Sequence, residues 1–170
     1  MPAMSKPTKD QSESENLLHM ELERGSVVIE MRPDLAPKHV ARIKELVREG
    51  FYDGLTFHRV IEGFMAQGGD PDGDGTGGSG TNIDAEFSDE PHVRGSVSMA
   101  RSGHPDSADS QFFIVFEPAA WLDGEYTIWG QVVEGMEHVD GLKHGDQRRN
   151  GEVTDPDMMI SLRIAADQAD

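Results

Sequence analysis

Eight short apolar runs set the tightest limit on how this chain can fold. Their residues partly alternate between apolar and polar, the period of a half-buried β-strand, and turn-forming residues separate them. The runs cover residues 17–23, 26–31, 55–61, 64–67, 96–100, 112–116, 127–133 and 158–165. Helices do not alternate with them regularly, so an antiparallel arrangement is favoured over a parallel sheet.

Two helices are predicted between these runs. Pro37 suits a first helical turn and Gly50 suits the position just past a helix end. Apolar residues repeat at helical spacing between them, at Val40, Ile43, Leu46 and Val47. A shorter helix is predicted around Met136, Val139 and Leu142. The fold class is therefore mainly β: a closed eight-stranded antiparallel β-barrel capped by two α-helices. Side chains fill the interior of a barrel of this size, so a ligand would bind on its outside or rim.

The length of 170 residues suits one domain, which we place over residues 17–166. Residues 1–16 are predicted to be a flexible polar arm, because they offer little to bury, and residues 167–170 a short tail. There are no cysteines, which excludes disulfides and thiolate chemistry. The first residues lack the apolar segment of a signal peptide, and no apolar run is long enough for a membrane span. We expect a cytoplasmic monomer without a membrane partner.

The formal net charge of −17 argues against nucleic acid as a partner, because an acidic surface repels phosphates. Such a charge is compatible with simple solubility and with adaptation to a salty environment. The sequence leaves both explanations open.

Residues 68–82 contain seven glycines and are predicted to form a long loop with two apparent motifs. Asp70, Asp72 and Asp74 resemble the start of an EF-hand calcium loop, but Thr81 stands where the bidentate Glu belongs. The glycines at 73–78 match a dinucleotide-binding pattern without its strand and helix. We therefore expect no metal and no cofactor, and keep a calcium-binding module as a rival hypothesis.

Residues 57–69 carry the most informative chemistry. They place the cation Arg59 close in sequence to two apolar side chains, Phe64 and Met65, and to a neutral amide, Gln67. The segment has no nucleophile, and the chain has no Gly-x-Ser-x-Gly motif. A positive donor beside an apolar pocket suits rotation about a proline peptide bond. His58 should point to the opposite face from Arg59, inward, and form a local hydrogen bond.

At this point the chain resembles the cyclophilin-type peptidyl-prolyl cis–trans isomerases, in a bacterial-like form. Four blocks carry the resemblance over roughly residues 17–165: FHRVIEGFMAQGGD at 57–70, GSVSMA at 95–100, SQFFI at 110–114, and WLDG at 121–124 followed by Gly130. It implies an eight-stranded barrel capped by two helices, in agreement with the strand pattern. It also implies isomerisation of X-Pro bonds in proline-containing polypeptides, and help in protein folding.

The resemblance assigns roles to eleven residues. Arg59 becomes the catalytic residue, and Gln67 and Gln111 become amides that orient the substrate. The proline pocket is walled by Phe64, Met65, Phe113 and Leu122. The peptide groove is bordered by Ala100, Arg101, Trp121 and Tyr126.

Two of these residues depart from many eukaryotic members, which have Asn in place of Arg101 and His in place of Tyr126. Both replacements are similar to bacterial members. Trp121 resembles the residue that favours cyclosporin binding, which makes cyclosporin A a candidate ligand. A proline-peptide binding or chaperone module with weak turnover is the main alternative function. Arg59 argues against it, because binding alone needs only the pocket.

Overall fold

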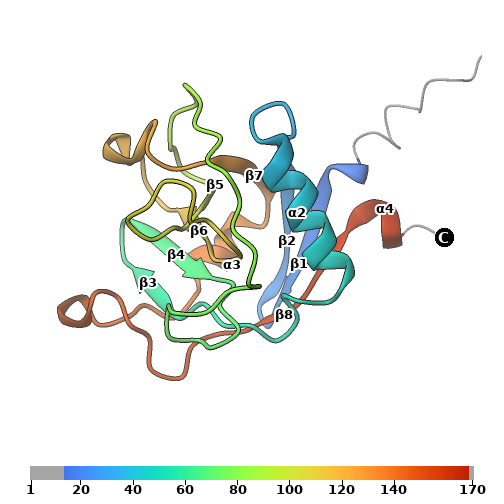
Figure 1. The fold of residues 1–170 in the computed structure, drawn as a ribbon. Helices are drawn as coiled ribbons and strands as arrows, with labels where there is room; N and C mark the ends of the chain where they lie inside the picture. The colour runs from blue at the N-terminus through green and yellow to red at the C-terminus, as the bar shows by residue number, and fades with distance from the viewer. Residues whose placement is uncertain (1–13, 169–170) are drawn as a thin grey trace, which may run out of the picture.

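The computed structural model describes residues 14–168, and eight antiparallel strands form one strongly curled sheet (Figure 1). The order across the sheet is β3-β4-β6-β5-β7-β2-β1-β8. The strands are β1 Leu17–Leu22, β2 Gly25–Met31, β3 Arg59–Ile61, β4 Met65–Gly68, β5 Ser96–Met99, β6 Phe112–Val115, β7 Ile128–Glu134 and β8 Met159–Ile164. The predicted mainly β architecture is confirmed. The expected loop covers residues 69–82, which hold no strand or helix, because Gly68 still belongs to β4.

The helices of the described residues are few and mostly short: α2 Pro37–Arg48, α3 Met136–Asp140 and α4 Ala165–Gln168. Pro37 opens α2 as predicted, but Ala36 supplies no side-chain cap. Glu86 replaces that cap, since its carboxylate accepts hydrogen bonds from the backbone N–H groups of Lys38 and His39 at 3.0 and 2.8 Å. Within residues 14–168, no helix is long and apolar enough to cross a bilayer.

The expected closed barrel is not confirmed, because the edge strands β3 and β8 do not pair with each other. The strand predicted over residues 55–61 shrinks to the three residues of β3. Isolated backbone hydrogen bonds span the gap, from Gly54 N to Met159 O (2.7 Å) and from Val153 N to His58 O (3.0 Å). The opposite segment bends at residues 154–155, where Asp155 has a positive φ of 53°, so no regular ladder forms there.

Both ends of the described chain contact the domain. Asn16, within the predicted N-terminal arm, accepts a hydrogen bond from Met31 N at 2.6 Å. Asp167, within the predicted tail, belongs to α4 and pairs with Arg48 at 3.0 Å. Residues 1–13 of the predicted arm and residues 169–170 lie outside the described residues.

The apolar side chains divide into two clusters on opposite faces of the sheet. The larger fills the curled interior and includes Trp129 and Phe112, both fully buried. The smaller comprises Met65, Phe113, Val115, Ala119 and Leu122, with Phe64, Ala100 and Tyr126 packed against it. Neighbours on β6 therefore face opposite ways, as alternation requires, and the second cluster provides an apolar surface outside the barrel.

Candidate active site

The strand register brings the central site residues into one row across three strands. Arg59 on β3 lies opposite Gln67 on β4, and Gln67 lies opposite Phe113 on β6. Met65 lies two residues before Gln67 and so shares its face of β4. A cation, an amide and an aromatic ring thus stand side by side on the outer face, an arrangement that sequence spacing alone leaves open.

A hollow of about 330 Å³ lies over this row. Ten of the eleven residues predicted for the site line it, namely Arg59, Phe64, Met65, Gln67, Ala100, Arg101, Phe113, Trp121, Leu122 and Tyr126. The eleventh, Gln111, lies next to it and accepts a hydrogen bond from Gln67 Nε2 at 2.9 Å. The structure therefore brings the whole predicted set together, and the hollow lies outside the barrel as expected.

Aromatic rings form a large part of the lining of the hollow. The Phe113 side chain is 4% exposed. Its ring forms a T-shaped pair with Tyr126, with 5.7 Å between ring centres, and a stacked pair with His92, with 6.2 Å between ring centres. Phe64 packs against Trp121 at 5.5 Å. Trp121 is 67% exposed, which is unusual for an indole, so this ring offers a free apolar surface at the rim.

Arg59 enters the hollow half-buried and is held by neutral oxygen atoms. Nη1 donates to Gln67 Oε1 at 2.9 Å, Nε donates to the carbonyl of Asn150 at 2.9 Å, and Nη2 donates to Asn150 Oδ1 at 3.1 Å. Burial lowers the pKa of Arg59, but a guanidinium stays charged at neutral pH. The site therefore holds a fixed cation that no carboxylate of residues 14–168 pairs with.

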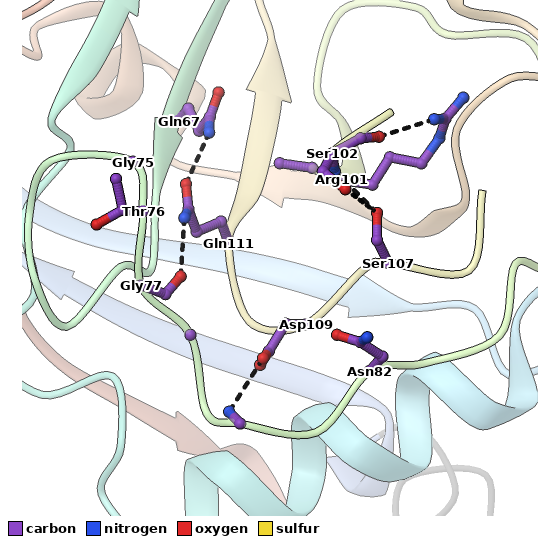
Figure 2. Close-up of a pocket in the computed structure, with 13 residues that line it drawn as sticks. Gln67, Gly75, Thr76, Gly77, Asn82, Arg101, Ser102, Ser107, Asp109 and Gln111 are labelled. Atoms are coloured by element: carbon purple, nitrogen blue, oxygen red, sulfur yellow. Dashed lines mark hydrogen bonds between the residues drawn. The ribbon is translucent and has the colours of Figure 1, made fainter. Parts of the chain in front are cut away.

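Two amides extend this arrangement into a directed chain (Figure 2). Gln67 donates to Gln111, and Gln111 Nε2 donates to the carbonyl of Gly77 at 2.9 Å. Each amide donates on one side and accepts on the other, so the oxygen of Gln67 must face Arg59. These hydrogen bonds thus determine that the amide oxygen of Gln67, and not its nitrogen, contacts the guanidinium.

Arg101 likewise pairs with no carboxylate in the part of the chain that the structure describes. Its Nε and Nη2 donate to the carbonyl of Glu125 at 3.0 and 2.8 Å, and its guanidinium lies 4.8 Å from the centre of the Tyr126 ring. Arginines elsewhere in the described chain do pair with acids, for example Arg94 with Asp140 at 2.6 Å. On a chain of net charge −17, the groove thus presents two cations with neutral partners.

A second hollow of about 450 Å³ shares Gln67, Ala100 and Arg101 with the first. Figure 2 shows its lining, which includes Gln111. The glycine-rich loop from Gly75 to Gly80 forms one side. Asp109 is bonded to that loop, since its carboxylate accepts hydrogen bonds from the backbone N–H groups of Ser79 and Gly80 at 2.7 and 3.0 Å. The two hollows are therefore neighbours on this side of the sheet.

The acidic loop motif has a structural use in the described residues. The carboxylates of Asp70, Asp72 and Asp74 lie within 4.8 Å of one another. Asp70 is almost fully buried and accepts hydrogen bonds from the backbone N–H groups of Asp72, Asp74 and Gly75. These bonds hold the pKa of Asp70 below its usual range against the opposing effect of burial. The carboxylate thus already stabilises the turn.

His58 is buried as predicted, at 7% exposure, and does not line the hollow over Phe113. Neither ring nitrogen makes a hydrogen bond of good geometry with the described residues, so the expected local bond is not found. Burial lowers the pKa of His58 and favours its neutral form.

Two residues next to the site are absent from the sequence prediction. Asn150 binds Arg59, and its one sequence signal is an Asn-Gly pair, which is typical of a turn. His92, 2% exposed, stacks on Phe113 and bonds Asp123 Oδ1 through Nδ1 at 3.0 Å and Ser98 Oγ through Nε2 at 2.9 Å. An isolated histidine in a sequence carries no sign of such a partner.

Comparison with known proteins gives one consistent result. The family model described as cyclophilin type peptidyl-prolyl cis-trans isomerase/CLD matches residues 17–164. A probable peptidyl-prolyl cis-trans isomerase of Brucella suis is 52% identical, over 94% of this chain and 88% of the relative. Peptidyl-prolyl cis-trans isomerase B of Bacillus subtilis is 48% identical, over 74% of this chain and 89% of the relative.

Solved structures agree with these relatives. A cyclophilin from Hirschia baltica superposes with a TM-score of 0.81 at 29% identity, covering 97% of this chain and 83% of the other. A Cryptosporidium parvum cyclophilin-type isomerase, crystallised in the presence of the dipeptide Ala-Pro, gives 0.80 at 30% identity and covers 87% and 98%. With the family model spanning nearly all the described residues, the chain belongs to the cyclophilin-type peptidyl-prolyl cis–trans isomerases and has their activity.

Proposed function

We propose that Arg59 is the catalytic residue and that the hollow over Phe113 holds the proline ring. The amide before a proline rotates slowly, behind a barrier of roughly 18–20 kcal/mol, because its nitrogen lone pair is delocalised into the carbonyl. Twisting the bond returns that lone pair to the nitrogen. A guanidinium N–H nearby gains a hydrogen bond to the twisted amide that the planar ground state cannot offer.

The observation that carries this proposal is the set of partners of Arg59. Neutral oxygens from Gln67 and Asn150 fix the guanidinium without neutralising it. A guanidinium has five N–H groups, and three of them donate to described residues, so among these contacts one is left on each terminal nitrogen. These two groups are available to a peptide in the hollow.

The apolar walls supply the remaining stabilisation. A rate gain of about 10⁵ requires roughly 7 kcal/mol, whereas one charge-assisted hydrogen bond contributes about 1.5–3 kcal/mol. We assign the remainder to exclusion of water by Phe64, Met65, Phe113 and Leu122 and to orientation of the peptide by Gln67 and Gln111. Ala100, Arg101, Trp121 and Tyr126 border the path of the peptide.

Titration with an Ala-Pro peptide tests the placement of this pocket. The chain has two tryptophans: Trp121 is 67% exposed at the hollow, and Trp129 is fully buried in the barrel. We expect the indole N–H signal of Trp121 to move on peptide binding while that of Trp129 stays in place. A shift of Trp129 alone, or of neither signal at saturating peptide, would contradict the assignment.

We further propose that the protein acts as a cytoplasmic monomer on proline-containing polypeptides, assists their folding, and binds cyclosporin A. The exposed Trp121 ring supports the drug site, and the net charge of −17 disfavours nucleic acid and anionic membranes as partners. Sedimentation, cell fractionation and drug inhibition test these points. A dimer, a membrane-bound protein or full activity in excess cyclosporin A would each refute its own part.

A further inference from the structure

We propose that Asn150 is a positioning residue that holds the Arg59 guanidinium ready for the prolyl nitrogen. Two oxygens of Asn150 accept hydrogen bonds along one edge of the guanidinium. The backbone carbonyl accepts from Nε at 2.9 Å, and Oδ1 accepts from Nη2 at 3.1 Å. A long arginine side chain is flexible, and this two-point contact restricts its rotation. The inference rests on the catalytic role proposed for Arg59.

The backbone at Asn150 makes this double contact possible. Asn150 ends the short helical turn Gln147–Arg149 in the left-handed conformation, with φ of 60°. Asn adopts this conformation more readily than most residues, and the following Gly151 continues it at φ of 84°. The carbonyl and the side-chain oxygen of Asn150 thereby reach the same guanidinium.

The loop that carries Asn150 is fastened to β3 on both sides of the contact. Val60 N donates to the carbonyl of Gly151 at 2.9 Å, and Gly145 N donates to the carbonyl of Val60 at 2.8 Å. A Cβ on Gly151 would lie 2.5 Å from Ile61 Cγ1, so a side chain there would force Ile61 or the loop to move. The position of Asn150 relative to Arg59 is therefore set by backbone hydrogen bonds.

The chemistry of Asn150 suits positioning without neutralisation. Its amide oxygen accepts a hydrogen bond from the cation but carries no charge, as does the oxygen of Gln67 on the other side. The two terminal N–H groups that remain keep their full positive character for a twisted amide. Asn150 therefore acts through Arg59, and it does not line the hollow over Phe113.

The test is Asn150→Gly, which keeps the carbonyl and tolerates positive φ but removes Oδ1. Exchange NMR with an Ala-Pro peptide at several concentrations separates kcat from peptide affinity. We expect kcat to fall three- to tenfold, with affinity within twofold of the parent. Gln147→Gly, an exposed position in the same turn, is the matched control for loop flexibility and should change kcat by less than twofold.

A second readout reports on the guanidinium itself. Rotation about the Nε–Cζ bond of Arg59, measured by nitrogen-15 exchange, should be at least threefold faster in Asn150→Gly. Asn150→Asp restores an oxygen acceptor, so it should slow this rotation again. Parent-like kcat in Asn150→Gly, or an equal loss in Gln147→Gly, would overturn the inference. The Arg59→Ala variant distinguishes the two proposals. If Arg59→Ala stays active, the role of Arg59 is refuted. If Arg59→Ala is inactive while Asn150→Gly stays active, only the role of Asn150 is refuted.

Discussion

Replacing Gln67 by Glu tests whether the site needs a neutral partner for its cation. The substitution nearly preserves shape but places a carboxylate about where Oε1 now lies, 2.9 Å from Nη1 of Arg59. It also removes the N–H that Gln67 donates to Gln111 at 2.9 Å, leaving two oxygens facing each other. The added negative charge draws the guanidinium toward the new carboxylate and away from the substrate.

The size of the effect follows from the two classes of hydrogen bond. A bond from a charged donor contributes about 1.5–3 kcal/mol, and a bond between neutral groups about 0.5–1.5 kcal/mol. If the new carboxylate reduces the first class to the second, the transition state loses about 1–1.5 kcal/mol. That corresponds to a loss of about five- to twelvefold in kcat.

Exchange NMR on an Ala-Pro peptide measures this loss, and Gln111→Glu is the matched control. That variant carries the same change one link further from Arg59, where it can still accept from Gln67 and loses only the bond to Gly77. We expect its kcat to fall less than threefold. An undiminished kcat in Gln67→Glu, or equal losses in both variants, would refute the reasoning.

Three further predictions concern the pocket wall, pH and calcium. Phe113→Leu should weaken peptide binding about fivefold, since it loses aromatic contact of about 1 kcal/mol; an unchanged KM would contradict this. The free energy of unfolding should fall as the pH drops below about 6.5, because burial lowers the pKa of three histidines in the folded protein. Below that pH the unfolded chain binds more protons than the folded one, and each histidine lowers the free energy of unfolding by at most about 1.4 kcal/mol per pH unit. The three are His39, His58 and His92. Thermal unfolding between pH 7.5 and 5.5 checks this, and a constant Tm would refute it. Calcium should give no heat in titration calorimetry, because Asp70 already caps backbone N–H groups, whereas micromolar binding would revive the calcium module.

Alternation in the sequence was sufficient to predict most of the strands, because each has one face on a buried cluster. It could not predict that the edge strands β3 and β8 leave the sheet open between them. Whether residues 55–58 form a strand depends on their partner segment, which bends at residues 154–155, almost a hundred residues later. Helix α4 was missed for a similar reason, since its pairing of Asp167 with Arg48 is a long-range contact.

The candidate site also contains residues that the sequence predicts and residues that it does not. The residues that line the hollow were predicted through the family resemblance, and the register of β3, β4 and β6 explains why they meet. Asn150 and His92 were missed because their roles depend on contacts made in the fold. Asn150 contacts Arg59 from ninety-one positions away, partly through its backbone, and His92 depends on the approach of Asp123.

Arg59→Ala tests the central claim most directly. Exchange NMR on an Ala-Pro peptide gives the catalysed rate and the affinity from one titration. We predict at least a tenfold loss of catalysed isomerisation while peptide binding largely survives, because the apolar pocket remains. This also separates an isomerase from a binding module with weak turnover. Unchanged turnover in a folded Arg59→Ala protein would remove Arg59 from the mechanism and contradict the account.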